Sequence, residues 1–398
     1  MAVPQGCRTF GIDAAGCRVV TCARMDGARI LLTAAAGAAW GEAMLGARLG
    51  NRALLWGGAL ALAPGALDFV AGLVLRTSAH LAFSAAATHS LVVVGLAAAL
   101  VPRWLASPGK KAKLSRGRIA CFAALAWLTG PLLACLTVPG VQVLWPFPAP
   151  RLCADVLAPG DAMPGLLLAV PLAAMAWVRG KKKADLAKRR RLWWWGLALA
   201  GSYLVVLLAG KLWATAGFGA DLARRGVGGT PHGASPTAWN PLLWRGLARR
   251  DDAVWLAHRS IWENRSTPVR WIILPRHQDA FARFADTAEA RRLAATSGDW
   301  WICRPNATGL WLADLRAGEH RVWGERRGMV DLRCRRAWHF QPDGPGDPVR
   351  RLRLERQPAP EAFTRLAKRS FGDRTALDGI PRLAGVPGML PEILATAE

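Results

Sequence analysis

The sequence predicts an α-helical, polytopic membrane bundle of about five to six spans, followed by a small soluble α+β domain. Residues 25–215 run in long apolar blocks that are separated by short basic loops. Beyond them, charged residues are spread throughout and no apolar run is long enough to cross a bilayer. With 398 residues, the chain has room for both parts.

Residues 1–24 contain no apolar core of the kind found in a cleaved signal peptide. We interpret them as an N-terminal extension, with a mis-assigned start and translation from Met25 as the alternative. Six apolar segments follow within the membrane part. They are residues 30–46, 53–75, 80–102, 119–144, 163–178 and 192–214. The first is short and carries Glu42, so it is expected to lie at the interface or inside the bundle.

The formal charge of +25 is explained largely by topology. Many of the Lys and Arg residues lie in two short loops, 103–118 and 179–191, which is the positive-inside pattern of an inner-membrane protein. If both loops are cytoplasmic, the C-terminal domain is periplasmic. The expected partners are the lipid bilayer and, for the remaining Arg excess, anionic lipid headgroups. No nucleic acid is expected.

The C-terminal part divides into a Gly/Pro-rich linker (216–235), an α+β domain (236–375) and a tail (376–398). Apolar patterns predict strands near 269–275, 309–318 and 321–334, and amphipathic helices at 279–295 and 359–371. Cys303 and Cys334 share this domain. They could pair if it lies outside the cytoplasm, but their geometry stays open at the level of sequence.

Thr88-His89-Ser90 interrupts an otherwise apolar segment. A polar cluster within a span can mark a functional site or can hold neighbouring helices together through hydrogen bonds. The imidazole of His89 is therefore either a ligand or a structural group, and both alternatives stay open.

Several stretches of the chain are similar, in the same order along the sequence, to the motifs of one known protein family. They are residues 25–68, "SAAATHS" at 84–90, "LTGPLLACLTVPGVQVLWPF" at 128–147, "VLAPGDAMP" at 156–164, and segments at 235–261 and 309–318. Over about residues 25–345 the chain resembles the bacterial inner-membrane metal-dependent hydrolases. That family has a Pro-Asp turn, a His-Arg-x-x-Thr-His-Ser segment, a Thr-His-Pro-Leu-Leu-Asp stretch and Leu-Trp-Pro-Phe.

The resemblance implies a metal site, but most ligand positions are changed. Where the family has His or Asp, this chain has non-ligand residues, namely Ile30, Gly65, Ser84, Gly130, Ala134 and Ala158. Asp26 and His89 keep their places, and Asp68 is displaced from its family position. The candidate metal ligands are therefore His89, Asp68 and Asp26, with Thr88 and Ser90 supporting His89.

A hydrolytic metal needs about three protein ligands and an open position for water. The sequence therefore favours a catalytically degenerate homologue without a cofactor and with a structural, regulatory or partner-binding role. In that case Ile30, Gly130, Ala134 and Ala158 are expected to form a close-packed apolar patch. The alternative is an active hydrolase with a remodelled zinc or manganese site around His89 and Asp68, acting on a lipid-linked or interfacial substrate.

His80 is a further candidate for such a remodelled site. On a regular helix, however, it would face away from His89, nine residues later.

Overall fold

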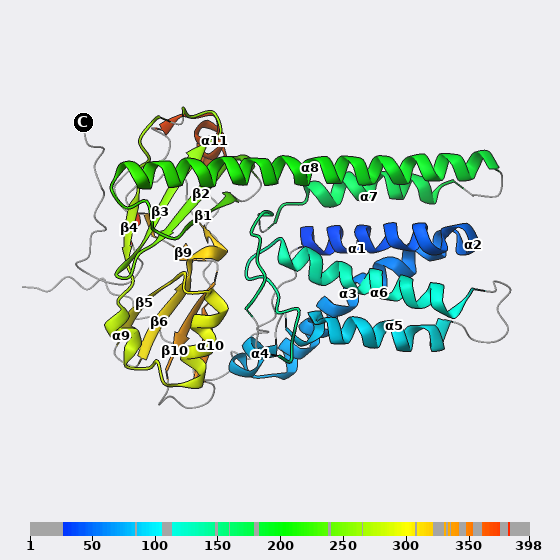
Figure 1. The fold of residues 1–398 in the computed structure, drawn as a ribbon, viewed down its shortest axis with the longest axis horizontal. Coiled ribbons are helices and arrows are strands. Elements are labelled where there is room, and N and C mark those ends of the chain that lie inside the picture. The colour runs from blue at the N-terminus through cyan, green and yellow to red at the C-terminus, as the bar shows by residue number, and fades with distance from the viewer. Residues whose placement is uncertain are drawn as a thin grey trace, which may run out of the picture.

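The molecule consists of a helical bundle and a β-rich domain that lie end to end (Figure 1). The computed structural model describes residues 27–83, 86–105, 114–147, 150–158, 160–178, 183–237, 240–264, 266–306, 309–320, 330–331, 333–334, 336–341, 348–352, 360–374 and 381–382. The bundle contains α1 (Gly27–Gly41), a π-helical turn (Glu42–Gly46), α2 (Ala47–Leu49), α3 (Asn51–Val74), α4 (Thr77–Phe83), a 3₁₀ turn (Ala87–His89), α5 (Leu91–Leu105), α6 (Arg116–Cys135), α7 (Met163–Ala176) and α8 (Lys183–Arg224).

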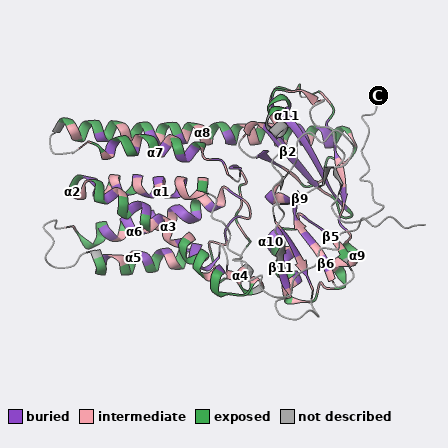
Figure 2. Ribbon diagram, turned by 180° about the vertical axis from the view of Figure 1, so that it is seen from behind, coloured by how far each residue is buried: buried purple, intermediate pink, exposed green. Residues whose placement is uncertain are grey.

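Four helical segments are long and apolar enough to cross a membrane. They are Gly27–Leu49, Asn51–Val74, Arg116–Cys135 and Ala184–Arg224, and two shorter apolar helices, Leu91–Trp104 and Met163–Ala176, lie beside them (Figure 1). The outer faces of these helices are exposed and apolar (Figure 2), as at Leu55 (74% exposed) and Val205 (66%). So much exposed apolar surface is unusual on a water-soluble protein and fits a lipid-facing bundle.

Small residues bring α1 and α3 into close contact. A Cβ atom built on Gly57 would lie 2.1 Å from the carbonyl oxygen of Gly37, and one on Gly41 would lie 1.9 Å from that of Ala53. Gly37 and Gly41 form a Gly-x-x-x-Gly pair, the spacing that lets two membrane helices approach backbone to backbone.

The predicted first segment is packed inside the bundle, where the charge of the Glu42 carboxylate is paired with that of an arginine. Both Glu42 carboxylate oxygens accept hydrogen bonds from the Arg189 guanidinium, at 2.9 and 2.6 Å. Arg189 also donates to the side chain of Asn51 and to the carbonyl oxygens of Met175 and Val178. Although it lies in a predicted basic loop, Arg189 is only 3% exposed and joins three parts of the bundle.

The expected span at 80–102 is not a single helix. It is divided into α4, the 3₁₀ turn that ends at His89, and α5. The expected span at 119–144 ends nine residues early, at Cys135, and Leu144-Trp145-Pro146-Phe147 lies in the connection that follows. Polar groups at 88–90 and the Pro-Gly pair at 139–140 break these apolar runs, which hydropathy alone does not detect.

The β-rich domain contains two four-stranded antiparallel sheets. The first is β1 (His232–Thr237), β2 (Asn240–Arg249), β3 (Ala253–Ser260) and β4 (Ile272–Pro275), and the second has the order β11 (Val349–Leu352), β10 (Ala337–Phe340), β6 (Gly309–Asp314) and β5 (Trp301–Asn306). Short elements complete it, namely α9 (Gln278–Ala282), α10 (Ala288–Ser297), a 3₁₀ turn (Leu315–Ala317), β7 (Glu319–His320), β8 (Val330–Asp331), β9 (Arg333–Cys334), α11 (Pro360–Ser370) and β12 (Pro381–Arg382).

The layers of this domain follow from the two faces of each sheet. One face of the first sheet packs against Ala214, Phe218 and Leu222 of α8. Its other face meets the second sheet through a small apolar cluster. The far face of the second sheet is covered by α10 through Ala290 and Leu293.

Helix α8 is shared between the bundle and the domain. Its 42 residues correspond to about 63 Å at 1.5 Å per residue, roughly twice the thickness of a bilayer core. Of the linker expected at 216–235, only residues 225–231 separate α8 from β1. The apolar face of α8 therefore continues directly into the domain core.

Other predicted elements differ in detail. The amphipathic helix expected at 279–295 is two helices, α9 and α10, because Thr287 caps the second one by accepting a hydrogen bond from the N–H of Ala290. The helix expected at 359–371 is confirmed as α11. Cys303 is a free thiol, whereas the side chain of Cys334 lies outside the described residues. Of the tail, only 381–382 is described.

Candidate functional site

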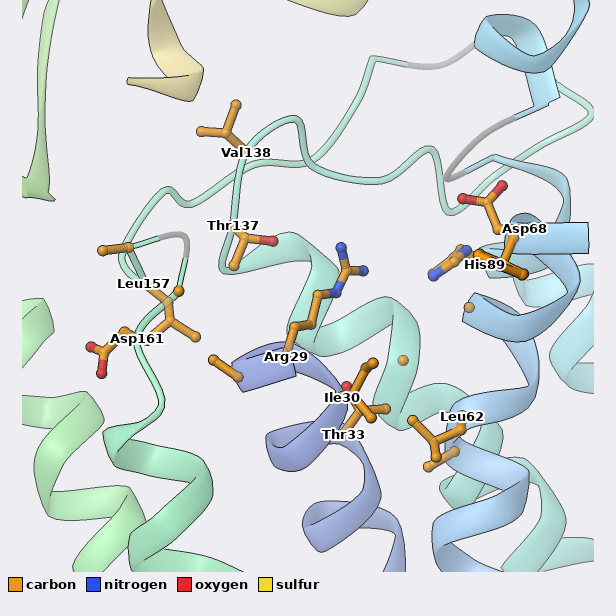
Figure 3. A pocket seen from close by; sticks show the side chains of 17 residues that line it. Arg29, Ile30, Thr33, Leu62, Asp68, His89, Thr137, Val138, Leu157 and Asp161 are labelled. Atoms are coloured by element: carbon orange, nitrogen blue, oxygen red, sulfur yellow. The ribbon is translucent and has the colours of Figure 1, made fainter. Parts of the chain in front are cut away.

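A cavity of about 180 Å³ lies at the end of the bundle that faces the β-rich domain. Its walls come from the start of α1, the second half of α3, the 3₁₀ turn before α5, the end of α6 and the connection between α6 and α7 (Figure 3). These segments are far apart in the sequence, and their convergence makes this cavity the candidate functional site.

The cavity brings together most of the positions that the resemblance predicts to be former ligand positions. Ile30, Gly65, Gly130 and Ala158 all line it, together with Asp68 and His89. Ala134 is buried but does not line the cavity. The expectation of a close-packed apolar patch is therefore wrong: small side chains at these positions leave a space, and polar groups share its wall. Asp26 and Ser84 lie outside the described residues.

His89 is held in place by the break before α5. Its Nδ1 lies 2.9 Å from the Thr88 hydroxyl, and the Thr88 carbonyl oxygen accepts a hydrogen bond from the Trp127 indole at 3.2 Å. His89 is 3% exposed. Burial, with Arg29 and Arg151 nearby, lowers the pKa of His89 to about 3, so the imidazole is neutral at physiological pH. Thr88 thus supports His89 directly.

Ser90 has a different role from the one expected. Its hydroxyl donates to the carbonyl oxygen of Ala87 at 3.0 Å and accepts from the N–H of Val93 at 3.4 Å. This is the pattern of a residue that caps the start of a helix, here α5. Ser90 therefore stabilises the break that positions His89 rather than the imidazole itself.

Asp68 lies on the His89 side of the cavity (Figure 3). Its carboxylate oxygen Oδ1 is 3.8 Å from His80 Nε2, and the same nitrogen is 3.2 Å from the Asp68 carbonyl oxygen. His80 is not part of the cavity lining, because its ring packs over Gly72. The helix does break between His80 and His89, but the break leaves His80 outside the cavity.

Asp161 lines the opposite wall (Figure 3) and is already engaged. Its Oδ2 accepts a hydrogen bond from the Tyr203 hydroxyl at 2.8 Å, and its Oδ1 accepts one from the N–H of Met163 at 3.0 Å. The second bond lies at the start of α7, so this carboxylate fixes the beginning of that helix against α8.

Arg29 is a cavity residue that sequence reasoning missed. Its side chain extends from the first turn of α1 into the space between Thr137 and His89 (Figure 3). An arginine next to Ile30, at the beginning of an apolar segment, was the available signal. Its guanidinium carries five N–H donors, enough to hold a protein partner and a ligand together.

The side chains of the cavity do not fit the metal site of the resembling family. Among the described residues, no group of three His, Cys, Asp or Glu side chains is placed to hold a metal ion. Asp68 and His89 supply two donors on one side, while Asp161 is bonded on the other. A guanidinium beside these donors is also unfavourable for a divalent cation.

Charged groups continue from the cavity towards the β-rich domain. Lys211 of α8 donates to the carbonyl oxygens of Asp155 and Ala234, at 2.9 and 2.8 Å, and so ties the α6–α7 connection to β1. Burial raises the pKa of the Asp155 carboxyl to about 6, against the effect of nearby positive charges. Those charges are Lys211, Arg245 and Arg316.

Comparison with models of known protein families, with curated proteins and with solved structures finds no match to this chain.

Proposed function

We propose that this chain is a multi-spanning bacterial inner-membrane protein that is a catalytically silent relative of the membrane-bound metal-dependent hydrolases. Its role is to bind a partner or ligand rather than to hydrolyse one. One observation carries this proposal: Ile30, Gly65, Gly130 and Ala158, at family ligand positions, line one cavity with Asp68 and His89. Those four side chains cannot coordinate a metal, and they leave a space rather than the close-packed patch expected of a filled site.

The chemistry of the lining supports binding over catalysis. Hydrolysis by a metal needs a coordinated water, and hydrolysis without a metal needs a positioned base and nucleophile. The pKa of His89, lowered to about 3, makes its imidazole a weak base, and Asp161 is bonded to Tyr203 and to the backbone. The cavity offers a cation, a few polar groups and apolar walls, which suit recognition.

The sidedness of the bundle supports an inner-membrane location with the β-rich domain in the periplasm. Helices α5 and α7 end, and α6 and α8 begin, at the end of the bundle far from the β-rich domain (Figure 1). The two basic sequence segments join these helices, so the positive charge gathers at the end opposite the domain. Under the positive-inside rule that end is cytoplasmic, and the cavity then opens at the periplasmic side of the membrane.

The metal content of the purified protein tests this proposal. We expect the detergent-purified wild type and His89→Ala to contain far less than one zinc or manganese ion per chain, measured by inductively coupled plasma mass spectrometry. Near-stoichiometric metal in the wild type that is lost in His89→Ala would overturn the proposal and favour an active remodelled site around His89 and Asp68.

A further inference from the structure

The two ends of the cavity differ in their side chains. Arg29, Asp68 and His89 lie at the end near the β-rich domain, together with the apolar Val138, whereas Ile30, Leu62 and the hydroxyl-bearing Thr33 lie deeper in the bundle (Figure 3). Along α3, Asp68 lies about 9 Å closer to the domain than Leu62, since six residues separate them at 1.5 Å each. This polarity is that of a lipid at the membrane surface, with its headgroup outward and its chain inward.

The cavity is also adjacent to the lipid-facing side of α3. Phe69 lines the cavity and is nevertheless 40% exposed. Its neighbours on α3, Leu67, Val70 and Leu73, are 48%, 53% and 51% exposed. In a membrane these side chains contact acyl chains, so lipid lies directly beside this wall of the cavity.

The size of the cavity limits what it encloses. An apolar cavity of about 150 Å³ holds a ligand the size of benzene. A volume of about 180 Å³ therefore encloses a small headgroup and the first part of a chain, but not a whole lipid. The rest of the chain has to lie outside, along the exposed apolar face of α3.

The charge around His89 favours an anion. Both Arg29 and Arg151 create a positive potential at this imidazole. Of the two carboxylates, Asp161 accepts from Tyr203 and Met163, and Asp68 is close to His80 and interacts electrostatically with Arg151, which leaves Arg29 as the cation that faces the ligand space. Arg29 is the charged side chain that extends furthest into the open space (Figure 3).

We infer that the cavity binds a membrane amphiphile with a small anionic headgroup, such as a phosphate monoester, which Arg29 holds while the chain lies against Ile30 and Leu62. This inference rests on the proposed function, since it requires a binding cavity rather than a metal centre. Arginine suits the role because its planar fork of donors matches phosphate and carboxylate oxygens.

Native mass spectrometry of the full chain in a non-ionic detergent tests the inference. The probes are lysophosphatidic acid, lysophosphatidylcholine of the same acyl chain, and inorganic phosphate. We expect lysophosphatidic acid to bind best and Arg29→Gln to weaken it about tenfold or more, the range for losing a charge-assisted hydrogen bond. Arg52→Gln, an exposed arginine at the far end of the bundle, is the matched control and should bind like the wild type.

A second variant keeps the test independent of the charge. Ala158→Leu places three extra carbons into the cavity and leaves the charge of Arg29 in place, and it should reduce binding by a similar factor. Unchanged binding in Ala158→Leu, or in a folded Arg29→Gln, would overturn the inference. Equal binding of the two lysolipids would also overturn it, as would equally strong binding of inorganic phosphate alone.

Metal analysis of the same samples distinguishes a failure of the proposed function from a failure of the inference about the amphiphile. Stoichiometric metal would overturn the proposed function whatever the lipids do. A metal-free protein that binds none of the probes would overturn only the inference about the amphiphile.

Discussion

Asp155 shows how burial changes the protonation of a single side chain. Its pKa is raised from 3.8 to about 6, so between about pH 4 and 6 the folded state binds more protons than the unfolded state. Stability therefore falls as the pH rises through this window, and the whole penalty is present above about pH 6. The left-handed backbone at Asp155, with φ 46°, suits asparagine as a replacement.

We predict that Asp155→Asn is more stable than the wild type above pH 6, by at most about 3 kcal/mol. The difference should disappear below about pH 4, where both chains are uncharged at this position. Thermal unfolding of the detergent-purified proteins from pH 4 to 8 measures it. Asp252→Asn, at a side chain 82% exposed, is the control. A constant difference at all pH values would contradict the assignment to Asp155 ionisation.

Cys303 shows the effect of burial on a thiol. It is 1% exposed, its Sγ donates to the carbonyl oxygens of Arg276 and His277, and burial raises its pKa to about 12. We predict that N-ethylmaleimide at pH 8 leaves Cys303 unmodified in the native protein and modifies it after denaturation, because only the thiolate reacts. Peptide mass spectrometry measures both states, and rapid native modification would show that β5 opens readily.

At the scale of residues, the sequence predicted several of the side chains that line one cavity but missed a charged one among them. Ordered motifs identified Ile30, Asp68, His89 and Gly130, which do line one cavity. Arg29 was missed because an arginine at the start of a span is usually explained by headgroups. Its contribution depends on a side-chain direction that the sequence does not contain.

At the scale of elements, the close contact between α1 and α3 depends on glycine residues, which have no side chain to hold the helices apart. We predict that Gly57→Ala destabilises the bundle by about 1–3 kcal/mol, because the new Cβ would lie 2.1 Å from the Gly37 carbonyl oxygen and force the helices apart. Gly95→Ala in α5 is the control, since nothing lies within 4 Å of its Cβ position. Unfolding in mixed detergent micelles compares the two, and equal stabilities would rule out the close contact.

The Glu42–Arg189 pair connects the π-helical turn to α8. We predict that Arg189→Ala costs about 3–5 kcal/mol, because it leaves the Glu42 carboxylate buried without its cation. The double variant with Glu42→Gln should recover part of this loss. Arg190→Ala, at an exposed position, should change little. The same unfolding assay measures the stability of each variant. Similar losses of stability for Arg189→Ala and Arg190→Ala would mean that the Glu42–Arg189 pair is not formed.

Element boundaries were predicted less well than element types, for physical reasons. Hydropathy averages over a window, so it detected the apolar run at 80–102 but not the break that Ser90 and Thr88 stabilise within it. It also ended the last span near 214, where α8 leaves the apolar part, although the helix continues to Arg224. That continuation depends on packing against the first sheet, which is a tertiary interaction.

At the scale of the whole molecule, α8 fixes the domain above one end of the bundle, so sidedness is a property of the entire chain. We predict that Ser266→Cys, on an exposed loop of the β-rich domain, reacts with a membrane-impermeant maleimide in intact spheroplasts. Arg190→Cys, at the opposite end of the bundle, should react only after lysis, since the positive charge gathered there is retained in the cytoplasm. The parent chain, with its native cysteines, gives the background. The reverse labelling pattern would place the domain in the cytoplasm, and with it the cavity, whose ligand would then have to come from the inner leaflet.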